Sequence, residues 1–441
     1  MSKLEVNTVA PQCGTTLTLG ESGDTVTLGS GASQSGFGRT GTVDWDTTAK
    51  TASFTAVSGD GYFVNTTSGA ITVTLPAGSA NAIVAISDYA STFQTNNVTI
   101  TPNGTDKING INANATLSTQ GIAVSLVYVD STRGWKSVTG SDNDTTGIPP
   151  AAFVTATGGT ITCCGDFKIH TFTGPGTFTV SCAGNCAGSN TVDYLVVAGG
   201  GGAGATQSGG GGGGGYRESS GAASGCYTAS PLGACVSALP VSVQGYPITV
   251  GGGGSGKPTS CGNARGCSGA NSIFSTVTST GGGGGGANST GAIGLSGGSG
   301  GGGSDGGAGG SGNTPPVSPS QGNNGGPSTT PSSGGGGGGA SAAGSPATTI
   351  NVGANGGNGA TTSINLSPVT RAGGGGGGGR PSGCATTPQG GSGGGGNGRN
   401  DGSGSNGTDN TGGGGGGVTC NAGFTSGNGG SGIVIIRYKF Q

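Results

Sequence analysis

Charged residues are scarce in this chain of 441 residues. Only 7% of the residues are Asp, Glu, Lys or Arg, and the formal net charge is -2. The 15 lysines and arginines form no basic stripe along the sequence, whereas proteins that bind nucleic acid use such a stripe to neutralise phosphates. We therefore expect no nucleic-acid partner.

Groups that could carry catalysis are equally few. His170 is the only histidine, and it lies in "KIHTFTGPGTFTV" (168–180), where alternating apolar residues predict a strand. Asp44 and Asp46 flank Trp45 on another predicted strand, so they would share one solvated face rather than form an acid/base pair. The sequence therefore predicts a protein that is not an enzyme and that holds no cofactor.

Long apolar runs are also absent. The stretch "IVIIRYKF" (433–440) is far shorter than the roughly 20 residues that a membrane-spanning helix needs, so we expect no membrane span. The beginning, "MSKLEVNTVAPQ", lacks the apolar segment of a secretory signal. Because the chain nevertheless has eleven cysteines, we expect synthesis in the cytoplasm without a signal peptide and a later release, by lysis, into oxidising surroundings.

Ten of the eleven cysteines lie after residue 160, in close groups. No group has the spacing of a zinc site, so we expect no metal. Short loops between cysteines close easily, which favours local disulfides, with plain buried thiols as the alternative. The candidates are the pairs Cys226 with Cys235 and Cys261 with Cys267, and in addition Cys163 and Cys182.

Glycine, by contrast, is abundant and unevenly distributed. Of 111 glycines, 25 precede residue 199, which leaves 86 in the remaining 243 positions. The chain therefore consists of a glycine-poor part before residue 199 and a glycine-rich part after it. The expected segments are an N-terminal attachment region and β shaft (1–41), a β-sandwich (42–140), a linker (141–150), a small β domain (151–198), a glycine-rich domain (199–432) and a closing strand (433–441).

The part before the glycine region has the pattern of an all-β stem. "TLTLG" (16–20) and "TVTLG" (25–29) recur nine residues apart, and rungs this thin need other copies of the chain, so we expect a homotrimeric shaft. Hairpin strands packed on the next domain are the alternative. Between 42 and 140, short β runs separated by turn residues predict an antiparallel sandwich without helices. Its aromatic residues are expected in the core or a trimer interface, or else as a sugar-stacking platform; they are Trp45, Tyr62, Phe63 and Trp135.

After the four glycines 199–202 that open the glycine region, eight further runs of four to seven glycines follow in the last part of the chain. They have no strict Gly-X-Y period, which excludes collagen. Their similar lengths favour polyglycine II helices packed side by side over a flexible tether, because only glycine lets such backbones approach. The runs are 209–215, 251–254, 281–286, 300–303, 334–339, 373–379, 393–396 and 412–417.

Three segments carry a resemblance to a known group of proteins. The stretches "MSKLEVNTVAPQCGTTLTLGESGDTVTL", "VDYLVVAGGGG" and "GGSGIVIIRYKF" resemble tail-fibre proteins of marine phages, notably cyanophages. The glycine region also resembles the distal adhesins of T-even-like phages, in which a polyglycine II sandwich displays loops that bind the host. The resemblance implies a virion fibre, attached to other tail proteins through its N-terminus, with a tip that binds a host polysaccharide or outer-membrane protein.

Recognition would lie in the loops between runs, because glycine presents no side chain to a ligand. Alternate loops should emerge at opposite ends of the glycine region, so only about half could face a host. A purely structural fibre or collar with a glycine spacer, and an ice-binding or silk-like protein, are the other functions considered. The candidate receptor contacts, which could instead merely solvate loop ends, are Tyr216, Arg217, Tyr227, Lys257, Arg265 and Arg380.

Overall fold

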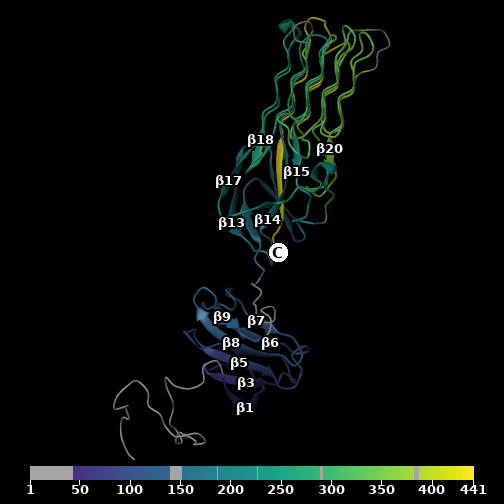
Figure 1. The fold of residues 1–441 in the computed structure, drawn as a ribbon. Helices are drawn as coiled ribbons and strands as arrows, with labels where there is room; N and C mark the ends of the chain where they lie inside the picture. Colours follow the sequence, from purple (N-terminus) through teal and green to yellow (C-terminus); the bar gives the residue numbers. More distant parts are fainter. Residues whose placement is uncertain (1–42, 140–150, 186, 226, 289–291, 382–386) are drawn as a thin grey trace, which may run out of the picture. The chain divides into compact units, whose positions relative to one another are not determined.

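The computed structural model describes the chain except for residues 1–42, 140–150, 186, 226, 289–291 and 382–386 (Figure 1). The chain divides into two compact units, Met1–Pro149 and Pro150–Gln441. In the described residues the regular structure is β-strand with two short 3-10 helices, which confirms the all-β expectation. No helix in this part is long and apolar enough to cross a membrane. The predicted shaft and linker lie outside the described residues.

The first unit is a sandwich of two sheets. One sheet has the strand order β1-β3-β5-β8-β9 and the other β2-β4-β6-β7. Through β6 the chain alternates between the sheets, so each strand lies beside the one two places earlier. The strands are β1 (Asp44–Lys50), β2 (Phe54–Thr55), β3 (Asp60–Val64), β4 (Ile71–Thr74), β5 (Ile83–Asp88), β6 (Val98–Thr101), β7 (Ala115–Leu117), β8 (Ala123–Asp130) and β9 (Gly134–Ser137).

The expectation of a purely antiparallel sandwich is wrong for this unit. The pairs β1–β3, β3–β5, β2–β4 and β4–β6 are parallel, and only the last strands of each sheet pair in antiparallel fashion. Alternation of apolar residues is the same in both arrangements, so it does not reveal strand direction. The direction follows from the connections, which here cross to the opposite sheet instead of turning back as hairpins.

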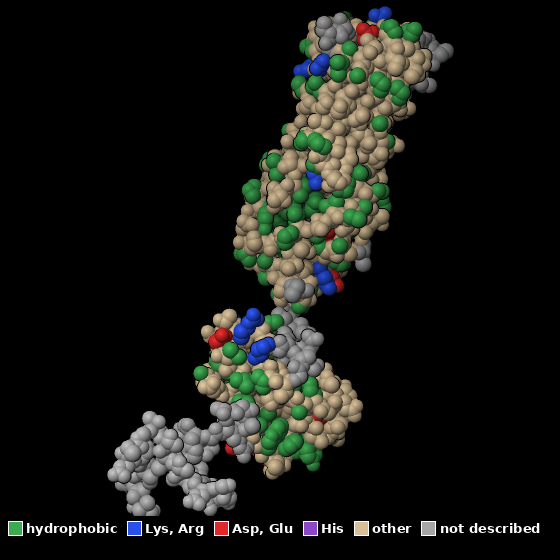
Figure 2. Space-filling view, in the orientation of Figure 1, with side chains coloured by type: hydrophobic (Ala, Val, Ile, Leu, Met, Phe, Trp, Pro, Cys, Tyr) green, Lys and Arg blue, Asp and Glu red, His purple; other side chains and the backbone are tan. Residues whose placement is uncertain are grey.

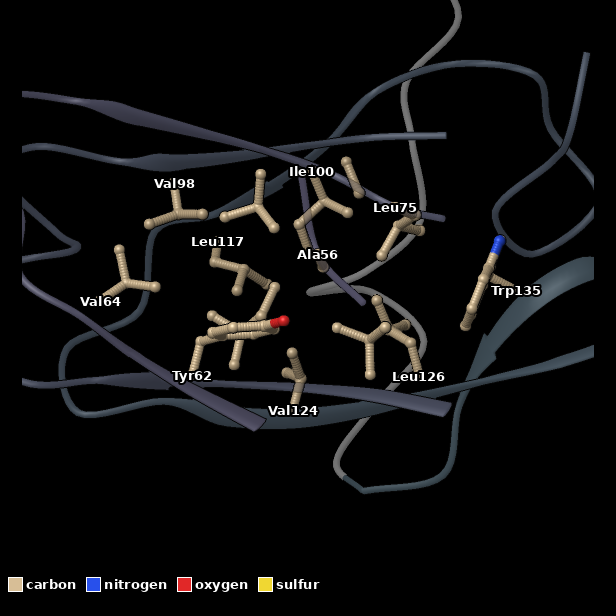
Figure 3. Packing of buried hydrophobic residues seen from close by; sticks show 14 of the residues in the cluster. Ala56, Tyr62, Val64, Leu75, Val98, Ile100, Leu117, Val124, Leu126 and Trp135 are labelled. Atoms are coloured by element: carbon tan, nitrogen blue, oxygen red, sulfur yellow. The ribbon is translucent and has the colours of Figure 1, made fainter. Parts of the chain in front are cut away.

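The apolar core of this unit lies between the two sheets (Figure 3). Tyr62 and Trp135 belong to it, and Trp135 is fully buried. Trp45 and Phe63 point to the outer side of the first sheet, where their ring centroids lie 4.9 Å apart and Trp45 remains 42% exposed. Two of the four predicted aromatic residues are thus core residues, and two form a pair on the outer side of the sheet.

The second unit begins with another sandwich. Its sheets have the orders β10-β13-β17-β18-β19 and β11-β12-β22-β14-β15, with β16 also paired to β14. A two-stranded hairpin, β20–β21, forms a separate small sheet. The strands are β10 (Val154–Thr157), β11 (Thr160–Cys164), β12 (Phe167–Phe172), β13 (Gly176–Ala183), β14 (Thr191–Val197), β15 (Tyr216–Glu218), β16 (Leu239–Pro240), β17 (Gly245–Thr249), β18 (Ser272–Phe274), β19 (Val277–Ser279), β20 (Ala360–Thr362), β21 (Val369–Arg371) and β22 (Ile433–Lys439).

The segment 151–198 therefore does not form a domain of its own. Both of its sheets are completed by strands from later in the chain, and β22 pairs with β12 on one side and β14 on the other. The closing strand predicted at 433–441 is thus the centre of a sheet (Figure 1). Its six residues from Ile433 to Tyr438 are buried, which explains why the apolar end of the chain lacks polar alternation.

His170 is a core residue of this sandwich. Its Nδ1 lies 2.7 Å from the carbonyl oxygen of Gly158, and its Nε2 lies 3.0 Å from the hydroxyl of Tyr438. Burial lowers the pKa of the imidazole, which favours the neutral form. The aromatic rings of Phe178 and Tyr438 pack against it, so the only histidine has a structural role.

Glycine runs fill the rest of the second unit, where they lie side by side and bond through their backbones. Every third amide of the run 209–215 donates to the same neighbour, at 2.8–3.1 Å. The run therefore turns once in three residues. The bonds are Gly209 to Gly286, Gly212 to Gly283, Gly210 to Gly335, Gly213 to Gly338, Gly211 to Gly415 and Gly214 to Gly412.

The carbonyl groups of the same run accept bonds from three other segments. Gly201 donates to Gly212, Gly302 donates to Gly210, and Gly375 donates to Gly211. A Cβ added at Gly209 would lie 2.0 Å from the carbonyl oxygen of Gly302, a distance that no side chain tolerates. The described glycine runs are therefore an ordered, hydrogen-bonded array, which we call the glycine lattice, and not a tether.

Asparagine side chains complete the bonding at the surface of the lattice. The amide of Gly256 donates to Asn428 Oδ1 at 2.8 Å, and the amide of Asn428 donates in turn to Asn406 Oδ1 at 2.9 Å. A surface run lacks a glycine neighbour on one side, so an asparagine oxygen replaces the missing carbonyl acceptor. The same arrangement joins Gly390 to Asn397, Gln389 to Asn355 and Ser392 to Asn358.

Replacing Asn428 by alanine is expected to lower the free energy of unfolding of the second unit by about 0.5–1.5 kcal/mol, because the Gly256 amide loses its acceptor. Thermal and chemical denaturation of the purified variants would measure the change. Asn421→Ala is the control, because this exposed residue accepts only a long 3.8 Å bond from Cys420 Sγ. Equal stabilities of the two variants would contradict the capping role.

Candidate functional site

The connections between glycine runs gather at two ends of the lattice. One end adjoins the sheets, because the lattice is entered from β14 and left into β15 around the segment 198–215. We call the opposite end, which is at the top of the second unit in Figure 1, the far end. Its described connections are 206–208, 258–265, 304–306, 328–333, 348–352, 400–403 and 419–424, together with Lys257 and Arg380 at the ends of their runs.

Hydrogen bonds hold the far-end connections against one another. Thr206 Oγ1 donates to the carbonyl of Gly262 at 3.1 Å, and Thr259 N–H donates to the carbonyl of Phe424 at 2.9 Å. Ser304 Oγ donates to the carbonyl of Gln207 at 2.7 Å. Loops that are distant in sequence are thus joined to one another at the far end.

Three of the six predicted contacts lie at the far end: Lys257, Arg265 and Arg380. Arg380 is exposed, and Gln207, with its amide oxygen facing the guanidinium, accepts from Arg380 Nε at 2.6 Å and Nη2 at 3.0 Å. Lys257 and Arg265 are half-buried. Figure 2 shows basic and acidic side chains on this end of the unit.

Sequence reasoning missed several further groups of this end. The short segment "TQS" (206–208) between two runs contains Gln207, which is buried beside Arg380. The sequence feature that could have revealed this segment is the polar triplet itself, because three polar residues between two glycine runs indicate a turn. The charged residues missed here are Asp305, Arg399 and Asp401.

The other three predicted contacts, Tyr216, Arg217 and Tyr227, lie at the end that adjoins the sheets. Tyr216 is fully buried and donates its hydroxyl to Glu218 Oε2 at 3.0 Å. Burial raises its pKa well above the ordinary value. The prediction that Tyr216 contacts a receptor is therefore wrong. Tyr216 is a core residue, because side chains alternate along β15 and that of Tyr216 points inward.

Arg217 and Tyr227 have different surroundings. Arg217 alternates with its buried neighbours on β15 and is partly exposed on the side of the unit. The ring of Tyr227 lies 5.1 Å from the guanidinium carbon of Arg437, and burial raises the pKa of its hydroxyl. Neither belongs to the polar surface of the far end.

Buried ionisable groups gather beneath Tyr216. Glu218 accepts a bond from the Ser230 amide at 2.9 Å, and burial raises the pKa of its carboxyl group. Arg371 is 4% exposed, and burial lowers the pKa of its guanidinium. These groups lie under covering loops at the sheet end, away from the far-end surface.

The described cysteines among the disulfide candidates are free thiols. Cys163, Cys182, Cys235, Cys261 and Cys267 are exposed in the structure, and no bridge joins Cys261 to Cys267 there. Cys226, of the other predicted pair, lies outside the described residues. Bridging in an oxidising environment stays a prediction. The described residues contain no cluster of three His, Cys, Asp or Glu side chains that could hold a metal.

The second unit combines a two-sheet sandwich with the glycine lattice, so the chain is a glycine-rich β protein. The chain belongs to the family described as the glycine-rich domain, which matches residues 171–439. The match begins in β12, includes the lattice and ends with β22, so it lies within the second unit and leaves β10, β11 and the first unit outside. No curated protein matches the chain.

Proposed function

We propose that this chain is a fibre protein of a phage virion and that its glycine lattice is a polyglycine II sandwich whose far end binds the host cell surface. The three-residue bonding period of the run 209–215 supports the polyglycine II assignment, because that helix has three residues per turn. The similarity of the two chain ends and of the glycine region to phage fibres and adhesins supports the virion assignment.

The observation that carries the binding proposal is the gathering of side-chain-bearing loops at one end of a rigid lattice. Loops on a stiff scaffold are the usual place for recognition, because the scaffold bears the ordering cost and the loops remain free to vary. The far end has the basic residues Lys257, Arg265 and Arg380. A purely structural spacer would need no such collection, and it is the alternative that the experiment below must exclude.

We further propose that the fibre is a homotrimer. Trp45 is 42% exposed and its ring packs at a tilt against Phe63 on the outer side of a sheet, beside the small apolar group of Val43, Ile83 and Ala85. An apolar face of this kind is suited to contact with another copy. Sedimentation velocity that gives a monomer at micromolar concentration would contradict this part of the proposal.

The triple substitution of Lys257, Arg265 and Arg380 by alanine is expected to weaken binding to host cells at least tenfold, because the far end loses three of its cations. Fluorescently labelled full-length protein would be titrated against a panel of marine cyanobacteria and other marine bacteria. The control is Arg217→Ala, which removes one cation from the side of the unit and should leave binding unchanged. Binding to no strain, or equal binding by both variants, would favour the spacer.

A further inference from the structure

A cavity of about 450 Å³ opens beside the turn between β11 and β12, away from the far end. The turn contributes Cys164 and Phe167 to its wall, and β22 contributes Arg437. The loops that cover this face of the sheet contribute Tyr227, Ser363 and Leu366. The cavity is of the size that holds a small organic ligand.

The guanidinium of Arg437 is the unusual element of this cavity. Its side chain is only 3% exposed, and its guanidinium carbon lies 4.8 Å from the ring of Phe167 and 5.1 Å from the ring of Tyr227. Nη1 and Nη2 donate to the carbonyl oxygens of Ile364 and Gly225, each at 3.3 Å. Nε has no acceptor within the described chain. These bonds bring the guanidinium no negative charge.

The carboxylate opposite Arg437 across the sheet is hydrogen-bonded to serine groups. Asp193 pairs with Arg437 in the register of β14 and β22, but its Oδ1 accepts from Ser219 Oγ at 2.7 Å and its Oδ2 from the Ser224 amide at 2.7 Å and from Ser224 Oγ. A buried donor without an acceptor is costly, and Nε is such a donor. The cavity is where a ligand with an acceptor can enter.

We propose that this cavity binds a carboxylate-bearing sugar residue, with its carboxylate on Arg437. A carboxylate matches the planar guanidinium and supplies an acceptor for Nε. Phe167 and Leu366 offer apolar walls to the carbon face of a pyranose ring. The exposed carboxylate of Asp166 at the mouth can accept hydrogen bonds from the hydroxyl groups of a sugar.

This site is separate from the proposed receptor-binding end and requires no phage origin. A protein carboxylate is the other possible occupant, but a side chain on a peptide backbone has no hydroxyl groups to offer Asp166. The test must therefore distinguish the sugar from a bare carboxylate and from an acidic amino acid. Its outcome is independent of whether the far end binds cells.

Isothermal titration of the full chain would use sodium glucuronate as the probe, with glucose, acetate and N-acetylglutamate as comparisons. We expect glucuronate to bind at least tenfold more tightly than each of the other three, because only it combines the carboxylate with a hydroxylated ring. No heat from glucuronate up to about 10 mM, a very weak limit, would overturn the proposal. So would acetate or N-acetylglutamate that binds as well as glucuronate.

Two variants locate the binding. Arg437→Lys keeps the charge but loses the planar donors, and we expect at least a tenfold loss of glucuronate affinity. Because Arg437 is buried and its replacement can disturb folding, Leu366→Trp is the second variant: this residue is 44% exposed, and the larger ring should block the mouth. Ile350→Trp, at an aliphatic residue that is 59% exposed elsewhere, is the matched control. Unchanged affinity in Leu366→Trp, with a wild-type thermal melt, would exclude this cavity.

Discussion

Replacing Gly211 by alanine should destabilise the second unit by about 3–5 kcal/mol, the combined effect of overpacking and of two or three lost hydrogen bonds. The added Cβ would lie 2.0 Å from the carbonyl oxygen of Gly201 and 2.6 Å from its carbon. The segment around Gly201 must move away, and it would then lose the bonds that Gly201 donates to Gly212 and accepts from Gly415. Thermal melting and urea denaturation of the full chain would measure the loss.

Gly252→Ala is a matched control within another glycine run. A Cβ at Gly252 would have no atom within 4 Å, and the residue is exposed. Alanine there restricts the unfolded chain more than glycine does, so the variant should be unchanged or more stable by about 0.4–1 kcal/mol. The two substitutions are expected to change the stability in opposite directions, because only Gly211 is enclosed by neighbouring runs of the lattice. If both substitutions were harmless, the runs would be flexible in solution and the lattice would be refuted.

Removal of residues 433–441 should prevent the second unit from folding altogether. The deletion takes away β22, which bonds to strands on both sides and buries six of its seven residues. The loss exceeds the roughly 5–15 kcal/mol by which domains are stable. Limited proteolysis with mass spectrometry should then leave only a fragment that corresponds to the first unit, because the two units are separately compact.

A point substitution tests the same strand with less disruption. Ile436 is fully buried, so Ile436→Asp places an unpaired charge in the core and should cost more than about 4 kcal/mol. Val243→Asp is the control, because Val243 is 65% exposed and should accept the change with little effect. A deletion variant that still melts as two units would show that β22 is dispensable.

Three of the six contact residues predicted from the sequence lie at the far end, and the positions of these residues show why the other three do not. Lys257, Arg265 and Arg380 interrupt or terminate glycine runs, and interruptions mark the loops. Tyr216 interrupts a run in the same way, but it begins the buried strand β15. A glycine run has the same sequence whether it leads away from the sheets or back toward them, so the sequence does not show which loops reach the far end. The position of a loop depends on how many runs precede it after the chain leaves the sheets, and this number is known only from the folded chain.

The all-β class and the ordered glycine region follow from local chemistry: short alternating runs favour strands, and repeated runs of one length favour packing over disorder. Long-range pairing lies beyond such local signals. The parallel pairs of β1, β3 and β5, and the central place of β22 between β12 and β14, join residues that are distant along the chain. Apolar alternation is identical whichever strand lies alongside. The partner is selected by which arrangement buries both faces, and that is a property of the assembled sheets.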